Sequence, residues 1–73
     1  MASAHDRYFE LVLEKIAGDR YPSAELMDRI ELALADQAQL DDYLHVLLDK
    51  IEDDRYPSKQ MLDRVLRLAS PSR

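Results

Sequence analysis

The chain has 73 residues and no cysteine, and its 10 Lys and Arg residues against 15 Asp and Glu residues give a net charge of −5. A chain of this length forms one domain with a thin core, and because it has neither disulfides nor a Cys-based metal site, helix packing or a partner chain must stabilise it. The acidic balance repels phosphates and disfavours nucleic acid as a partner.

The first ten residues, MASAHDRYFE, contain no basic segment followed by an apolar one. That pattern is what a secretory signal requires. The longest apolar run is also far shorter than the ~20 residues of a membrane span. We therefore expect a cytoplasmic protein that does not bind a membrane.

The five residues DRYPS occur twice, at 19–23 and again at 54–58. When residues 6–34 are aligned with 41–69, 12 of the 29 pairs are identical, and most of the others are conservative. Such self-similarity at a fixed offset indicates a duplicated supersecondary unit. The sequence therefore predicts a single domain, residues 1–73, that is built from two repeats, 6–34 and 41–69, and ends in a flexible tail at 70–73.

Apolar residues recur three and four positions apart on both sides of each DRYPS segment, which predicts a helix before and after each one. In the first repeat these residues are Phe9, Val12, Leu13 and Ile16, then Leu26, Met27, Ile30, Ala33 and Leu34. In the second repeat they are Leu40, Tyr43, Leu44, Leu47, Leu48 and Ile51, then Met61, Leu62, Val65, Leu68 and Ala69. No stretch alternates with period two, so we predict an all-α fold.

Each DRYPS segment is interpreted as a structural turn between two helices. Proline cannot continue a helix and disfavours helical backbone at the residue before it, so Tyr21-Pro22 ends the first helix. Ser23 then offers its hydroxyl to the free amides of the next helix. The second copy, Tyr56, Pro57 and Ser58, is expected to act in the same way.

Two further expectations concern the surroundings of this turn. Gly18 is a candidate for a left-handed residue at the exit of the first helix. The rings of Tyr21 and Tyr56 are expected to cover the open end of each hairpin, because an amphipathic aromatic suits a half-buried corner. The Asp-Arg pairs at 28–29 and 63–64 suggest a local charge arrangement around each turn.

The joint between the repeats, ALADQAQLDD at 33–42, contains no Gly or Pro and leaves two alternatives. In the first, Asp36 caps a new helix with Gln39 as its capping-box partner, which gives four short helices arranged as two αα-hairpins in an antiparallel bundle. In the second, residues 24–52 form one continuous helix and the three-helix chain must dimerise to cover its apolar stripes. We favour the first.

In the favoured arrangement the duplicated positions should meet around a pseudo-two-fold axis, placing Ile16, Ile30, Ile51 and Val65 in one shared core. The 35-residue period matches that of tetratricopeptide repeats, but the characteristic Trp, Gly and Ala positions of those repeats are not found. Two units are also fewer than the three or so that a solenoid needs. Closure of the two units on each other, or pairing with a second chain, is therefore expected.

The residues that could carry chemistry are few. His5 and His45 lie in no metal-ligand or catalytic pattern, and His45 falls on the polar side of its predicted helix. The acidic run Glu52–Asp54 matches no calcium loop, and a solvated helix end explains it. We expect no enzymatic activity, no cofactor and no bound metal.

The candidate interaction surface lies at the edge of the apolar stripes, where Leu11 and Lys15 of the first repeat match Val46 and Lys50 of the second. We expect a non-catalytic protein-protein interaction or regulatory module that binds another protein, itself, or both. A homodimer would bury Leu11 and Val46 in an isologous interface. The alternative is an acidic inhibitor or decoy that occupies a basic nucleic-acid-binding surface on a target protein.

Overall fold

Four helices make up the part of the chain that the computed structural model describes, residues 3–70. They are α1 (Ala4–Gly18), α2 (Ala24–Leu32), α3 (Gln37–Asp53) and α4 (Lys59–Ala69). No strand occurs within these residues, so the all-α prediction with four helices is confirmed. The tail expected at 70–73 lies outside the described residues except for Ser70, which caps the end of α4.

The joint between α2 and α3 is a break, as the favoured alternative predicted. The carboxylate of Asp36 accepts a hydrogen bond from the backbone N–H of Gln39 at 2.9 Å and caps α3. The side-chain oxygen of Gln39 accepts from the backbone N–H of Ala35 at 3.0 Å, one residue before the position that a capping box would use. A continuous helix over 24–52 is therefore wrong.

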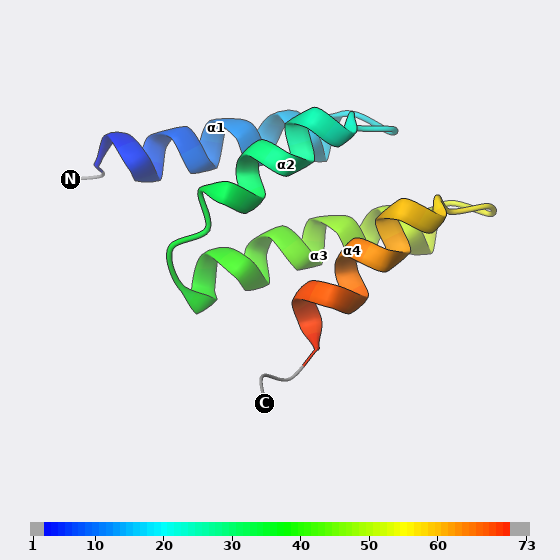
Figure 1. Ribbon diagram of the computed structural model, residues 1–73. Helices are drawn as coiled ribbons and strands as arrows, with labels where there is room; N and C mark the ends of the chain where they lie inside the picture. Colours follow the sequence, from blue (N-terminus) through cyan, green and yellow to red (C-terminus); the bar gives the residue numbers. More distant parts are fainter. Residues whose placement is uncertain (1–2, 71–73) are drawn as a thin grey trace.

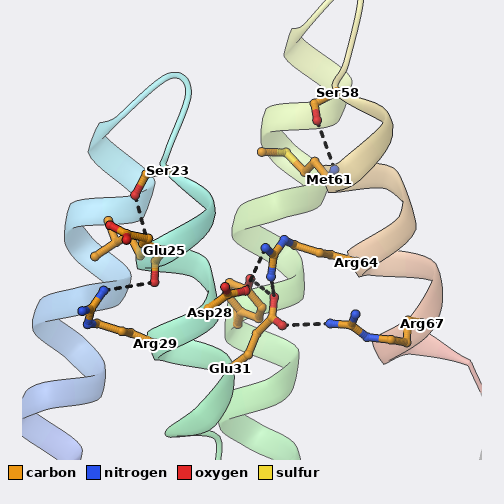
Figure 2. Close-up of polar contacts among 11 residues, drawn as sticks. Ser23, Glu25, Asp28, Arg29, Glu31, Ser58, Met61, Arg64 and Arg67 are labelled. Carbon is orange, nitrogen blue, oxygen red and sulfur yellow. Dashed lines mark hydrogen bonds and ion pairs between the residues drawn. The ribbon is translucent and has the colours of Figure 1, made fainter.

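The two serines of the DRYPS segments cap the following helices, which confirms the predicted N-caps. Ser23 Oγ accepts from the backbone N–H of Leu26 at 3.1 Å, and Ser58 Oγ accepts from that of Met61 at 3.2 Å (Figure 2). The first residue of each segment also has a role, because Asp19 and Asp54 each accept a hydrogen bond from the backbone N–H two residues later. Each segment thus bends the chain with two local side-chain contacts.

Replacing Ser23 or Ser58 by Ala is expected to lower the free energy of unfolding by about 0.5 to 2 kcal/mol, since one amide of the first turn then loses its acceptor. Chemical denaturation followed by circular dichroism measures this change. The matched control is Ser70→Ala, because Ser70 follows a helix and its hydroxyl donates to the carbonyl of Leu66 instead of capping an N-terminus. If both cap variants unfold at the denaturant concentration of the parent, the serines do not stabilise the helix starts.

Two expectations about the turns are wrong. The rings of Tyr21 and Tyr56 are exposed and cover nothing, whereas Pro22 is the buried residue of the first turn. The short proline ring reaches the interior of the corner, and Tyr21 stays outside with the Arg20 guanidinium stacked 5.5 Å from its ring centre. Gly18 is an ordinary last residue of α1, because no glycine of the described chain has a positive φ.

The two hairpins lie side by side and point the same way. α1 packs against both α2 and α3, and α3 packs against α4. Figure 1 shows both turns at the same end of the molecule, with α1 and α3 running in the same direction. The bundle is therefore flat, with extents of 39 × 33 × 18 Å. The second hairpin follows the first as the next unit of a stack would.

The core lies mainly between the hairpins. Its buried side chains are Phe9, Ile16, Met27, Ile30, Tyr43, Leu47 and Met61. The predicted shared core is found in part, because Ile51 and Val65 pack against the cluster that contains Ile16 and Ile30. Their surroundings are not equivalent, however: Ile16 and Ile30 are fully buried, whereas Ile51 and Val65 are only half-buried. Each hairpin turns a different face toward the other, so equivalent residues have unequal surroundings.

Candidate interaction surfaces

A polar cluster centred on Glu31 joins three of the helices. Glu31 lies on α2, and its mostly buried carboxylate accepts from the hydroxyl of Tyr43 on α3 at 2.6 Å. It also accepts from Arg64 at 2.7 Å and from Arg67 at 2.9 Å, both on α4 (Figure 2). One carboxylate of the first hairpin therefore binds three side chains of the second.

Asp28, one turn earlier on α2, completes the cluster by pairing with Arg64 at 2.9 Å. Burial alone lowers the pKa of Arg64, but the hydrogen bonds to Glu31 and Asp28 outweigh burial and leave that pKa above its ordinary value. The Asp-Arg pairs therefore do not form a local arrangement around each turn, because Asp28 binds the arginine of the other repeat. The cluster links the two hairpins through side-chain contacts.

Burial raises the pKa of Tyr43 above its ordinary value, and the hydrogen bond to Glu31 raises it further. Because the folded protein favours the neutral phenol, the associated stability is fully present below the unfolded-state pKa of about 10 and is lost as the pH rises above it. We expect the free energy of unfolding to fall in that range by up to about 1.4 kcal/mol per pH unit from this group.

Denaturation at a series of alkaline pH values measures this slope. Tyr43→Phe is the matched variant: it is less stable at neutral pH because it loses the hydrogen bond, but it has no hydroxyl to ionise, so its stability should depend less steeply on pH. Equal slopes for the parent and the variant above pH ~10 would contradict the assignment.

The structure divides the four residues of the candidate interaction surface into two pairs. Val46 is half-buried against the core, and Lys50 donates from Nζ to the carbonyl oxygens of Ala17 at 3.1 Å and of Asp19, at the end of α1. A cation at this position offsets the negative end of the helix dipole. Val46 and Lys50 therefore lie in the contact between α1 and α3, whereas Leu11 and Lys15 are exposed on α1.

The large apolar side chains that remain exposed form two sets besides the tyrosines of the turns. The first set, which we call the leading face, consists of Tyr8, Leu11 and Leu32 on the first hairpin. The second, the trailing face, consists of Leu48, Leu62 and Leu66 on the second hairpin. Leu32 is 89% exposed and Leu66 is 69% exposed. Exposure of such large apolar side chains to water is unfavourable.

The repeat alignment explains why these faces are open. Tyr43 is 0% exposed because the first hairpin covers it, and its equivalent Tyr8 is 43% exposed. Met27 is 4% exposed because it lies in the core between the hairpins, and its equivalent Leu62 is 41% exposed. Each open face thus carries at least one residue whose equivalent is buried in the other repeat.

Beside the trailing face is a groove of about 470 Å³ between the start of α3 and the end of α4. Its lining includes Leu40, Leu44 and Leu68, together with the polar Asp41 and Ser70. In the first repeat the equivalents of these two polar residues, Asp6 and Ala35, hold the side chain of Gln39 between them. The groove therefore occupies the position that Gln39 fills in the other repeat.

Within residues 3–70 no three His, Asp or Glu side chains are placed to hold a metal ion, and no helix of this part is long and apolar enough to cross a membrane. His45 is exposed, as its position on the helix predicted.

Comparison with known proteins finds no matching family model, no matching curated protein and no matching solved structure.

The sequence interpretation missed Glu31 and the trailing face. A signal for both was present in the repeat alignment, since Glu31 is opposite Leu66 and Leu32 is opposite Arg67. At these two pairs a charged residue in one repeat replaces an exposed leucine in the other. A charged and an apolar residue at equivalent helix positions indicate that the two repeats meet different surroundings.

Proposed function

We propose that this protein is a non-catalytic protein-protein interaction module that binds through its leading and trailing faces. The observation that carries the proposal is the unequal burial of equivalent residues: Tyr8 on the leading face and Leu62 on the trailing face are exposed, whereas their duplicates Tyr43 and Met27 are buried. Exposed apolar groups with a covered counterpart support a binding role, because contact with a partner would remove the same surface from water. We further propose a cytoplasmic location, with neither nucleic acid nor membrane as partner.

The proposal is tested by capture from cells with matched variants. Leu11→Glu places a charge on the leading face and Leu66→Arg places one on the trailing face, and both side chains are exposed, so the fold should persist. Tyr56→Glu is the control, since it makes the same kind of change at an exposed aromatic outside both faces. A partner that binds the parent and the control but is lost from a face variant supports the proposal; partners that bind all four proteins equally refute it.

A second candidate, the acidic inhibitor or decoy, is favoured by one observation. Asp49, Glu52 and Asp53 are all exposed at the end of α3, where the helix dipole already concentrates negative potential. A basic target surface would relieve this repulsion. Its affinity should fall steeply as salt is raised, whereas binding through the apolar faces should tolerate salt. Retention of the partner at high salt therefore selects the first candidate.

A further inference from the structure

We propose that the leading face of one molecule binds the trailing face of a second copy, so that the contact between the two hairpins of one chain is repeated between chains. The inference deepens the proposed function by naming the partner, and it rests on the apolar faces described above. Its basis is the offset of 35 residues between the repeats. Each contact within the chain joins a residue of the first hairpin to a residue of the second. In the contact between copies, the first residue is replaced by its equivalent 35 positions later in one copy, and the second by its equivalent 35 positions earlier in the next copy.

The first such contact involves Lys15, the exposed equivalent of Lys50. Within the chain, Lys50 donates to the carbonyls of residues 17 and 19 at the end of α1. Lys15 of the next copy would donate to the carbonyls of Glu52 and Asp54 at the end of α3. This helix end carries acidic side chains at the negative end of its dipole, an arrangement that a cation stabilises.

The second contact is an ion pair between copies. Within the chain, Arg64 pairs with Asp28 at 2.9 Å. Their equivalents are Arg29 on the leading side and Asp63 on the trailing side, and both are exposed. The contact that the structure gives Arg29 is a single long one, 3.5 Å to the backbone oxygen of Glu25 in its own helix (Figure 2). Arg29 and Asp63 thus have the charges, and the positions, to pair across a stack.

The third contact exchanges a charged pair for an apolar one. Within the chain, Arg67 binds Glu31 at 2.9 Å. Their equivalents are Leu32 and Leu66, the most exposed leucine of each face. Both members of this pair change together, so a stack of copies would bring leucine against leucine. Glu31 also binds Arg64 and Tyr43 within the chain. Their equivalents Arg29 and Tyr8 would meet Leu66 instead of a carboxylate, so Arg29 keeps Asp63 as its partner and the hydroxyl of Tyr8 has to stay in water.

The groove beside the trailing face fits the same arrangement. It lies where the first repeat receives Gln39, and the equivalent of Gln39 is Ala4 at the start of α1. In a stack, the first turn of α1 from the next copy would enter this groove. Because the side chain of Ala4 is smaller than that of Gln39, the groove has room for other residues of this first turn.

Such an interface joins two different surfaces and is therefore heterologous. Copies add head to tail and form either a closed ring or an open filament. The isologous homodimer expected from the sequence requires Val46 at the surface of each molecule. In the structure Val46 is half-buried against the core of its own chain. Assembly should depend on protein concentration, with each molecule supplying one face to the copy before it and the other to the copy after it.

Sedimentation of purified variants tests the direction of assembly. The parent and the Tyr56→Glu control should associate as concentration rises, whereas Leu11→Glu and Leu66→Arg should each associate at least about tenfold more weakly, because a charge enters an apolar contact. An equimolar mixture of these two variants should form one-to-one dimers and nothing larger, since one intact face remains on each. A mixture that stays monomeric while the parent associates overturns the head-to-tail arrangement.

A charge exchange provides a second test that does not depend on the leucines. Arg29→Asp and Asp63→Arg should each weaken association by placing like charges together, and the double variant should restore it. Failure of the double variant to recover overturns the pairing. A parent that stays monomeric at high micromolar concentration overturns self-association altogether, while the proposed function still stands or falls on the capture of another protein by the same variants.

Discussion

Replacing Glu31 by Ala is expected to lower the free energy of unfolding by about 3 to 5 kcal/mol, because the mostly buried guanidinium of Arg64 loses its nearest carboxylate. The hydroxyl of Tyr43 loses its acceptor in the same change and stays buried. Asp28 still pairs with Arg64, but its side chain is 64% exposed and compensates only in part. A single substitution thus leaves two polar groups of the second hairpin without the partner that they share.

A domain of this size has a total stability of roughly 4 to 11 kcal/mol, so this loss is a large fraction of the total and the Glu31→Ala variant should unfold at a clearly lower denaturant concentration than the parent. Circular dichroism during denaturation measures the loss. Glu10→Ala is the matched control, since Glu10 is an exposed residue of α1 and surface changes of this kind usually stay within about 0.5 kcal/mol. If Glu31→Ala unfolds at the same denaturant concentration as Glu10→Ala, the cluster does not stabilise the contact between the hairpins.

The parts of this structure that the sequence predicts are local. Ser23, Ser58 and Asp36 each bond to a backbone amide three residues later, so the identity of one residue and the helical pattern after it are sufficient evidence. The break at the joint follows in the same way, from one capping side chain in a segment of good helix formers. The starts of α2, α3 and α4 could therefore be predicted without knowing how the helices pack.

The packing of one hairpin on the other could not be predicted, because both repeats carry the same apolar stripe. The pattern of Leu13 and Ile16 in α1 recurs as Leu48 and Ile51 in α3, and periodicity alone assigns both pairs to a core. In the structure Ile16 is fully buried and Leu13 half-buried, whereas Leu48 is 41% exposed and Ile51 half-buried. Which copy is covered depends on the order of the units in space, a non-local property.

The candidate interaction surface shows the same limit. The repeat alignment pairs Leu11 with Val46 and Lys15 with Lys50, at the edge of the predicted stripes. Treating them as one surface assumed that equivalent residues have equivalent surroundings. A stack of two units does not satisfy this assumption, since it has one internal contact and two ends.

Replacing Ile16 by Ala is expected to lower the free energy of unfolding by about 2 to 5 kcal/mol, since this side chain is fully buried between the hairpins. The same deletion at the equivalent position, Ile51→Ala, should cost less, about 1 to 2 kcal/mol, because Ile51 is only half-buried in the single chain. Chemical denaturation of both variants at low protein concentration measures the difference. The two changes remove the same atoms from the same repeat position, so the difference reports their surroundings alone.

Protein concentration then separates a stack with open ends from a symmetric core. If copies associate head to tail, a second molecule covers Ile51 as the second hairpin covers Ile16, and the cost of Ile51→Ala should rise toward that of Ile16→Ala as concentration increases. The cost of Ile16→Ala should not change, because its surroundings are complete in one chain. Equal costs at low concentration would mean that the hairpins share one symmetric core, and a difference that persists unchanged at high concentration would mean that the trailing face stays in water.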